Sequence, residues 1–212
     1  MNRYTYGLNN PFTYVDPDGR DAIVVNFSTG AQISGHQFGH NGIISVHQDG
    51  SATFADFGPI NQGVAESPGI VNTLTLPRIA FGTNGLPTRA SFMEISAALA
   101  KASGRPADSI RLAYFKTGEA ETAKLDAWVQ YTYNRSRSRE GLTYNVFDQN
   151  CGHYCLTGLG IAQGRGAPPA GGFSFPNFDF WILRWLADAT YQMKPTVTTS
   201  ETYCIAGQGD CR

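Results

Sequence analysis

The sequence predicts an α+β fold in which an antiparallel sheet packs against helices. Short β-branched and apolar runs predict strands, and segments with an apolar residue at every third or fourth position predict amphipathic helices. Two of the runs, 40–47 and 53–57, are separated by turn-forming residues at 48–51. This spacing predicts a hairpin, so at least this part of the sheet is expected to be antiparallel.

The elements follow from local composition. The predicted strands cover residues 22–27, 40–47, 53–57, 74–76 and 110–115. The predicted helices cover residues 91–99, 119–134, 151–162 and 178–189. Ser91 and Glu94 form a capping box that begins the first helix. The last helix carries an apolar stripe that is predicted to pack on the core, and a lipid-facing role at a membrane interface is the alternative. The stripe consists of Phe178, Trp181, Ile182, Trp185, Leu186 and Ala189.

Length and charge narrow the function classes. The 212 residues, 42% of them hydrophobic, suffice for one catalytic domain, which we expect at 21–212, with a C-terminal tail at 195–212 and a strand-and-turn leader at 1–20. The net charge of −1 offers no basic surface for nucleic acid, so no such partner is expected. The sequence does not begin with a signal peptide, so we expect secretion by a specialised system.

Cys151 is the predicted nucleophile. A thiol is nucleophilic only as the thiolate, and the first turn of a helix beside a histidine favours that form. Asn150 is a good N-cap, and apolar residues follow it at helical spacing, so Cys151 is predicted at the helix start. A lone cysteine is more commonly a small buried hydrophobe, and the available histidines favour the catalytic role here.

Four histidines could supply the base: His36, His40, His47 and His153. His40 begins an apolar strand, and the hairpin offers Asp56 on the neighbouring strand. We therefore predict His40 as the base and Asp56 as the residue that orients it. His153 follows Cys151 by two positions and points to another side of a helix, so a structural or substrate-side role is expected. His47 is predicted to face solvent.

The first twenty residues resemble the end of the core of Rhs proteins. A tyrosine-rich stretch leads to Asn9-Asn10-Pro11 and then to Asp16-Pro17-Asp18-Gly19, which matches the Asp-Pro-x-Gly signature of that family. In the family this signature marks where the shell protein cuts itself and releases a C-terminal toxin, and leucine usually follows the glycine where this chain has Arg20. The resemblance implies a toxin domain from about Asp21 onward. It also implies three partners: an Rhs shell, a secretion apparatus and a cognate immunity protein.

A second resemblance is to the circularly permuted papain-like hydrolases. The motifs His40-Asn41-Gly42-Ile43, Tyr144-Asn145 and Asn150-Cys151-Gly152-His153-Tyr154 are similar to those of the lecithin:retinol acyltransferase-like branch. The relatives of that branch include cell-wall amidases of the NlpC type. The resemblance implies a permuted papain-like fold with Cys151 as nucleophile and His40 as base. It also implies a polar third member on the strand after His40, for which Asp56 is the best match.

The predicted reaction is acyl transfer through a thioester. Cys151 attacks a carbonyl, backbone N–H groups at the helix start stabilise the oxyanion, His40 protonates the leaving group, and water resolves the thioester. We expect contacts to the substrate or the oxyanion from Asn150, Gly152, His153 and Tyr144. No cofactor or metal is expected. An amide of a peptidoglycan peptide or a protein is favoured, because the aromatic helix at 178–189 is explained as core; a lipid ester is the alternative.

Two readings from other classes remain. Cys/His zinc coordination is conceivable, since His36 and His40 are four apart and Cys151, His153 and Cys155 are close in sequence. No Cys-x-x-Cys pair is present, which weakens this reading. A non-enzymatic interaction domain would leave the Asn-Cys-x-His motif unexplained.

Cysteine usage leaves the compartment open. Cys204 and Cys211 could form a disulfide in an oxidising compartment and would be two thiols in a reducing one. We expect the toxin to act inside a target cell, in either the periplasm or the cytoplasm.

Overall fold

A computed structural model describes residues 21–33, 36–47, 49–61, 63–165, 174–193 and 201–205. These residues form one antiparallel sheet of eight strands in the order β6-β4-β3-β2-β1-β5-β7-β8. The strands are β1 (Asp21–Ile33), β2 (His36–Val46), β3 (Ala52–Pro59), β4 (Glu66–Leu76), β5 (Ile110–Lys116), β6 (Leu142–Asn145), β7 (Ala189–Met193) and β8 (Glu201–Ile205). The helices are α1 (Arg89–Ser103), α2 (Glu119–Ser136), α3 (Cys151–Ala162) and α4 (Pro176–Leu186), with a 3-10 turn η2 (Ala107–Ser109). The predicted α+β class with an antiparallel sheet packed against helices is confirmed.

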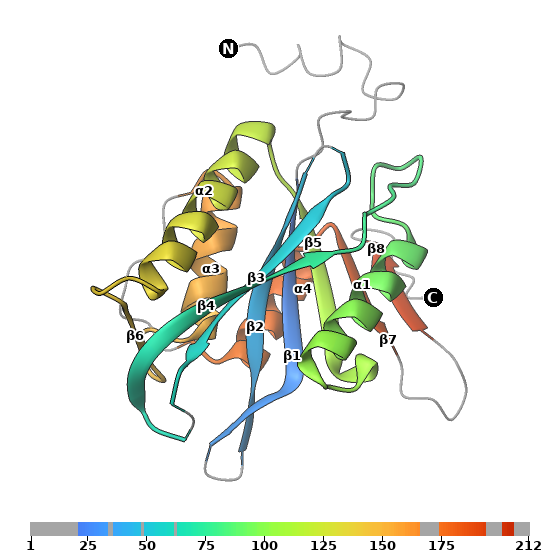
Figure 1. The fold of residues 1–212 in the computed structure, drawn as a ribbon. Helices are drawn as coiled ribbons and strands as arrows, with labels where there is room; N and C mark the ends of the chain where they lie inside the picture. The colour runs from blue at the N-terminus through green and yellow to red at the C-terminus, as the bar shows by residue number, and fades with distance from the viewer. Residues whose placement is uncertain are drawn as a thin grey trace.

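The sheet is covered on both faces. Alternate residues of β1 point to opposite sides, so Ala22 and Val24 pack with α2, α3 and α4, whereas Ile23 and Val25 pack with α1. Figure 1 shows α1 in front of the sheet and α4 behind it, with α2 and α3 lying together at one side. Because both faces of β1 are buried, its residues Ala22 to Val25 form a continuous apolar run without polar alternation.

α1 begins three residues earlier than the capping box predicted. Thr88 is the N-cap, and its side chain accepts a hydrogen bond from the backbone N–H of Ser91. Ser91 is buried and its hydroxyl is hydrogen-bonded to Ala80, so it ties the helix to the preceding loop. The predicted capping box of Ser91 and Glu94 is therefore wrong, because Thr88 is the N-cap of α1.

α4 presents a different face to the core from the one predicted. Phe180 and Leu183 are buried in the core at 4% and 8% exposure. The predicted core residues Trp181 and Trp185 are instead exposed, Trp185 at 70%. The helix ends at Leu186, so Ala189 of the predicted stripe lies on β7. The prediction that the stripe with Trp181 and Trp185 packs on the core is wrong, because the neighbouring stripe with Phe180 and Leu183 packs there instead.

The strands at both edges of the sheet were not predicted. β6 pairs with β4, and β7 joins β5 to β8. None of the described helices has the length and apolarity that crossing a membrane requires. The predicted leader at 1–20, most of the tail at 195–212, and Cys211 lie outside the described residues. The side chains of His36 and Cys204 also lie outside them, so the disulfide stays a prediction.

Candidate active site

Cys151 is the first residue of α3, where the sequence predicted it. Asn150 is the N-cap, and its side-chain Oδ1 accepts hydrogen bonds from the backbone N–H groups of Gly152 and His153 at 2.8 and 3.2 Å. Its Nδ2 donates to the carbonyls of Val146 and Ser174 at 2.8 and 2.9 Å. Asn150 therefore orders the helix start and also holds the two loops that flank Cys151.

His40 reaches the site from β2. Gly39 precedes it with a φ of 76°, a backbone conformation that glycine adopts most easily, and the pairing of β1 with β2 is irregular at this point. A side chain at Gly39 would also collide with Asn177 at the start of α4. The irregularity places the His40 ring beside Asp56 of β3, with Nε2 2.8 Å from Asp56 Oδ2. The sequence placed these two residues on neighbouring strands, and the structure brings them into contact.

A third strand extends this arrangement. Asn72 lies directly opposite Asp56 in the pairing of β3 with β4, and its Nδ2 donates to Asp56 Oδ1 at 3.0 Å. Both oxygens of the carboxylate are thus hydrogen-bonded, one to His40 and the other to Asn72. Sequence reasoning missed Asn72, because a polar residue in a strand carries no signal without the register.

Electrostatics favour a positively charged His40. Burial of the ring opposes the charge, but the negative charge of Cys151 and hydrogen bonds to Asp56 and Cys151 raise the pKa of His40 to about 10. Burial of Asp56 acts against its charge as well, yet the contacts with His40 and Asn72 hold the pKa of that carboxyl below its ordinary value. The site therefore suits a positively charged imidazolium at His40. Since Nε2 faces Asp56, the other ring nitrogen, Nδ1, is left for Cys151.

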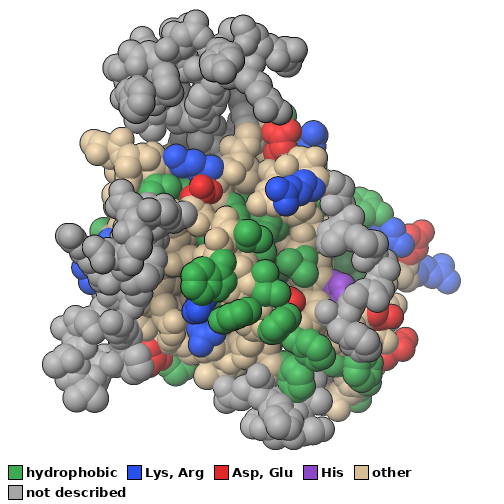
Figure 2. All heavy atoms as spheres, turned by 180° about the vertical axis from the view of Figure 1, so that it is seen from behind, with side chains coloured by type: hydrophobic (Ala, Val, Ile, Leu, Met, Phe, Trp, Pro, Cys, Tyr) green, Lys and Arg blue, Asp and Glu red, His purple; other side chains and the backbone are tan. Residues whose placement is uncertain are grey.

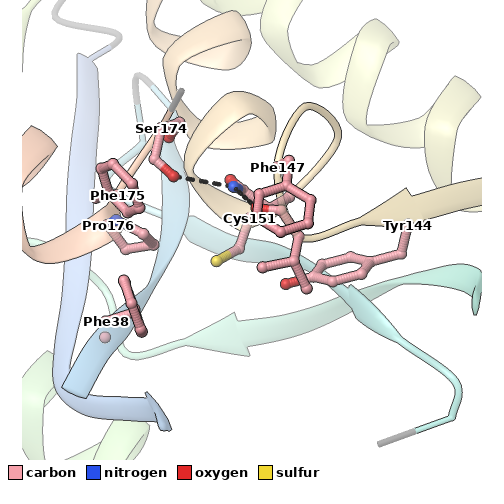
Figure 3. Close-up of a pocket in the computed structure, with 10 residues that line it drawn as sticks. Phe38, Tyr144, Phe147, Cys151, Ser174, Phe175 and Pro176 are labelled. Carbon is pink, nitrogen blue, oxygen red and sulfur yellow. Dashed lines mark hydrogen bonds between the residues drawn. The ribbon is translucent and has the colours of Figure 1, made fainter. Parts of the chain in front are cut away.

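Cys151 faces an apolar cleft of about 100 Å³. Figure 3 shows its sulfur between Phe38, Phe175 and Pro176 on one side and Tyr144 and Phe147 on the other. Gly39, Val146, Asn150 and Ser174 complete the lining. Apart from Tyr144 and Asn150, the sequence did not identify these cleft residues. The cleft residues come from three segments, 38–39, 144–151 and 174–176, that only the fold brings together.

The expected oxyanion contacts divide into two groups. The backbone N–H groups of Gly152 and His153 already donate to Asn150, so they cap the helix. Tyr144 lines the cleft, and burial together with the charge of Cys151 raises its pKa above the ordinary value, so its hydroxyl remains a proton donor. In the described part of the chain, the backbone N–H of Cys151 has no hydrogen-bond acceptor.

Gly152 is required by close packing. A Cβ there would lie 1.9 Å from Ser174 Oγ and 2.9 Å from Asp179 Oδ2. Ser174 donates to Asp179 at 2.5 Å, and the charge of His153 acts on the same carboxylate. Burial nevertheless raises the pKa of Asp179. This polar cluster connects the start of α3 to α4 behind the nucleophile.

The other cysteine of the motif points into the core. Cys155 is fully buried, donates to the carbonyl of Gly42 at 3.2 Å, and burial raises its pKa well above the ordinary value. Among the described side chains, no three His, Cys, Asp or Glu residues gather as a metal site would need. His47 lies 3.4 Å from Asp126, away from Cys151.

Comparison with known proteins places the fold. No family model matches the chain, and no curated protein matches it in sequence. The crystal structure of the type VI secretion system effector TseH superposes on it with a TM-score of 0.66 and 18% sequence identity. The match covers 88% of this chain and 98% of that one. The chain therefore shares the overall fold of TseH.

Proposed function

We propose that this protein is a cysteine-dependent hydrolase that transfers an acyl group to Cys151 and then to water. The observation that carries the proposal is a chain of contacts from Asn72 through Asp56 and His40 to Cys151. Cys151 is the first residue of α3 and lines the cleft. A base oriented by a third group beside a thiol is the arrangement that nucleophilic catalysis needs. The same geometry supports the permuted papain-like relationship that the sequence motifs imply.

The proposed reaction proceeds in two steps. The Cys151 thiolate attacks the carbonyl carbon, and the resulting oxyanion is stabilised by the backbone N–H of Cys151 and the hydroxyl of Tyr144. The tetrahedral intermediate collapses, the leaving group takes a proton from His40, and a thioester remains. Water then attacks the thioester and gives its proton to His40. The acid product leaves and the proton on His40 restores the imidazolium–thiolate pair.

The biological role we propose is that of a secreted effector toxin. TseH is a type VI secretion system effector, so the shared fold supports this role, and the Rhs-like segment at 1–20 supports delivery by an Rhs shell. On this proposal the chain acts inside a target cell and has a cognate immunity protein as partner.

Two kinds of bond are candidates for the one that this protein cleaves: the amide predicted from the sequence and a lipid ester. The amide was favoured because α4 was assigned to the core, and the exposed aromatic residues of α4 remove that reason. The cleft is mainly apolar, which favours a lipid ester as the second candidate. Comparing released fatty acid with cleaved peptidoglycan peptides or proteins in intoxicated cells decides between the two bonds.

Expression in bacteria, with and without an added periplasmic signal, tests the hydrolase proposal. Cys151→Ala and His40→Ala are expected to abolish toxicity in whichever compartment the wild type is toxic, because each removes one reacting group. Cys155→Ala is the matched control: it removes a thiol one turn along the same helix that does not line the cleft, so it should remain toxic. Full toxicity of both Cys151→Ala and His40→Ala would refute the mechanism.

A further inference from the structure

We propose that the outer face of α4 docks on an anionic lipid surface. The face is formed by Phe178, Trp181, Ile182, Trp185 and Leu186, which are between 42% and 70% exposed. Figure 2 shows hydrophobic side chains gathered at the centre of the side of the molecule on which α4 lies, with basic side chains next to them. Burying this face would remove several large apolar side chains from water, which is the main driving force for interfacial binding.

The residue types favour a membrane over a protein partner. Tryptophan at 181 and 185 suits the boundary between headgroups and acyl chains, because its ring is apolar and its N–H is polar. Arg184 is exposed between them, with its guanidinium 6.0 Å and 5.3 Å from the ring centres of Trp181 and Trp185. This combination is typical of helices that lie in the plane of an interface.

Charge favours an anionic surface. Partial burial and, to a smaller extent, repulsion by the nearby charge of Arg184 lower the pKa of Arg111 on β5. Within the described residues neither guanidinium has a carboxylate partner. The carboxylates of α4 and of the residues that follow it are engaged elsewhere: Asp179 accepts from Ser174, and Asp188 accepts from the backbone N–H of Lys116. Arg111 and Arg184 are therefore available to bind phosphate headgroups, and each positive charge near an anionic membrane surface strengthens binding.

The docking face is continuous with the cleft. Phe175, the N-cap residue of α4, lines the cleft and stacks on Phe38 with ring centres 5.6 Å apart. One turn further along, Phe178 stacks on Trp181 at 6.2 Å. Phe147, on the opposite wall of the cleft, is also exposed. A lipid surface that covers α4 would consequently lie beside the entrance to Cys151.

Vesicle binding by the full chain carrying Cys151→Ala tests the proposal without catalysis. We expect co-sedimentation with phosphatidylcholine vesicles that contain phosphatidylglycerol, together with a blue shift of tryptophan emission as Trp181 and Trp185 leave water. Replacing both tryptophans by serine should weaken binding at least about tenfold, since two large apolar groups stay in water. Arg184→Gln should weaken binding to the anionic vesicles by about fivefold and leave binding to pure phosphatidylcholine unchanged.

Met93→Ser is the matched control, because Met93 is exposed on α1 at the opposite face of the sheet. It should bind vesicles like the parent. No binding, or binding that the double tryptophan variant retains, would overturn the proposal. A dimer that dissociates in the double variant while vesicles are not bound would instead identify the face as an interface between two copies. Because vesicle binding requires no catalysis, these outcomes are independent of whether the hydrolase proposal holds.

Discussion

At the scale of single residues, Cys151 and the carboxylate of Asp56 together keep His40 positively charged. With its pKa raised to about 10, His40 is positively charged below that pH and loses its charge as the pH rises through it. Asp56→Asn removes a negative charge 2.8 Å from Nε2, so the pKa of His40 should fall. Asn72→Ala leaves the charge of Asp56 and removes one hydrogen bond of about 1 kcal/mol from its other oxygen, so it should change the pKa of His40 by less than one unit. NMR titration of the imidazole measures both, and an unchanged midpoint in Asp56→Asn would contradict the assignment.

At the scale of elements, the orientation of α4 decides which of its side chains hold the fold together. Leu183 is buried at 8% exposure, so Leu183→Ala should lower the free energy of unfolding by about 2–5 kcal/mol. Trp185→Ala should change it by no more than about 0.5 kcal/mol, because that ring is already in water. Urea unfolding followed by circular dichroism measures the two values. The reverse order would mean that the broad aromatic stripe faces the core after all.

At the scale of the whole molecule, the site exists only in the folded chain, since His40, Asp56, Asn72 and Cys151 come from four elements. Alkylation of Cys151 by iodoacetamide at neutral pH, located by tandem mass spectrometry, reports thiolate character without knowledge of the substrate. Its rate should fall in urea with the same midpoint as the circular dichroism of the sheet, because unfolding separates the thiol from His40. In the His40→Ala variant, Cys151 should be alkylated as slowly without urea as it is in the unfolded wild-type chain. Fast alkylation of the unfolded chain would mean that local sequence, and not His40, activates the thiol.

The sequence by itself determined the parts of the site that depend on local interactions. Asn150 as N-cap and Cys151 as first helical residue follow from capping chemistry within one turn, and the structure has both. The hairpin that places His40 and Asp56 on neighbouring strands follows from turn residues between two apolar runs, and the pairing of Gly42 with Asp56 agrees with it.

Only the tertiary structure decided what depends on register and on competition between faces. Asn72 joins the site because β4 pairs with β3 in a register that no local pattern specifies. α4 carries two overlapping apolar stripes, and periodicity cannot choose between them because both recur at helical spacing. The choice is made by the apolar surface of β1, β2 and α3, which buries Phe180 and Leu183 and leaves the tryptophans in water.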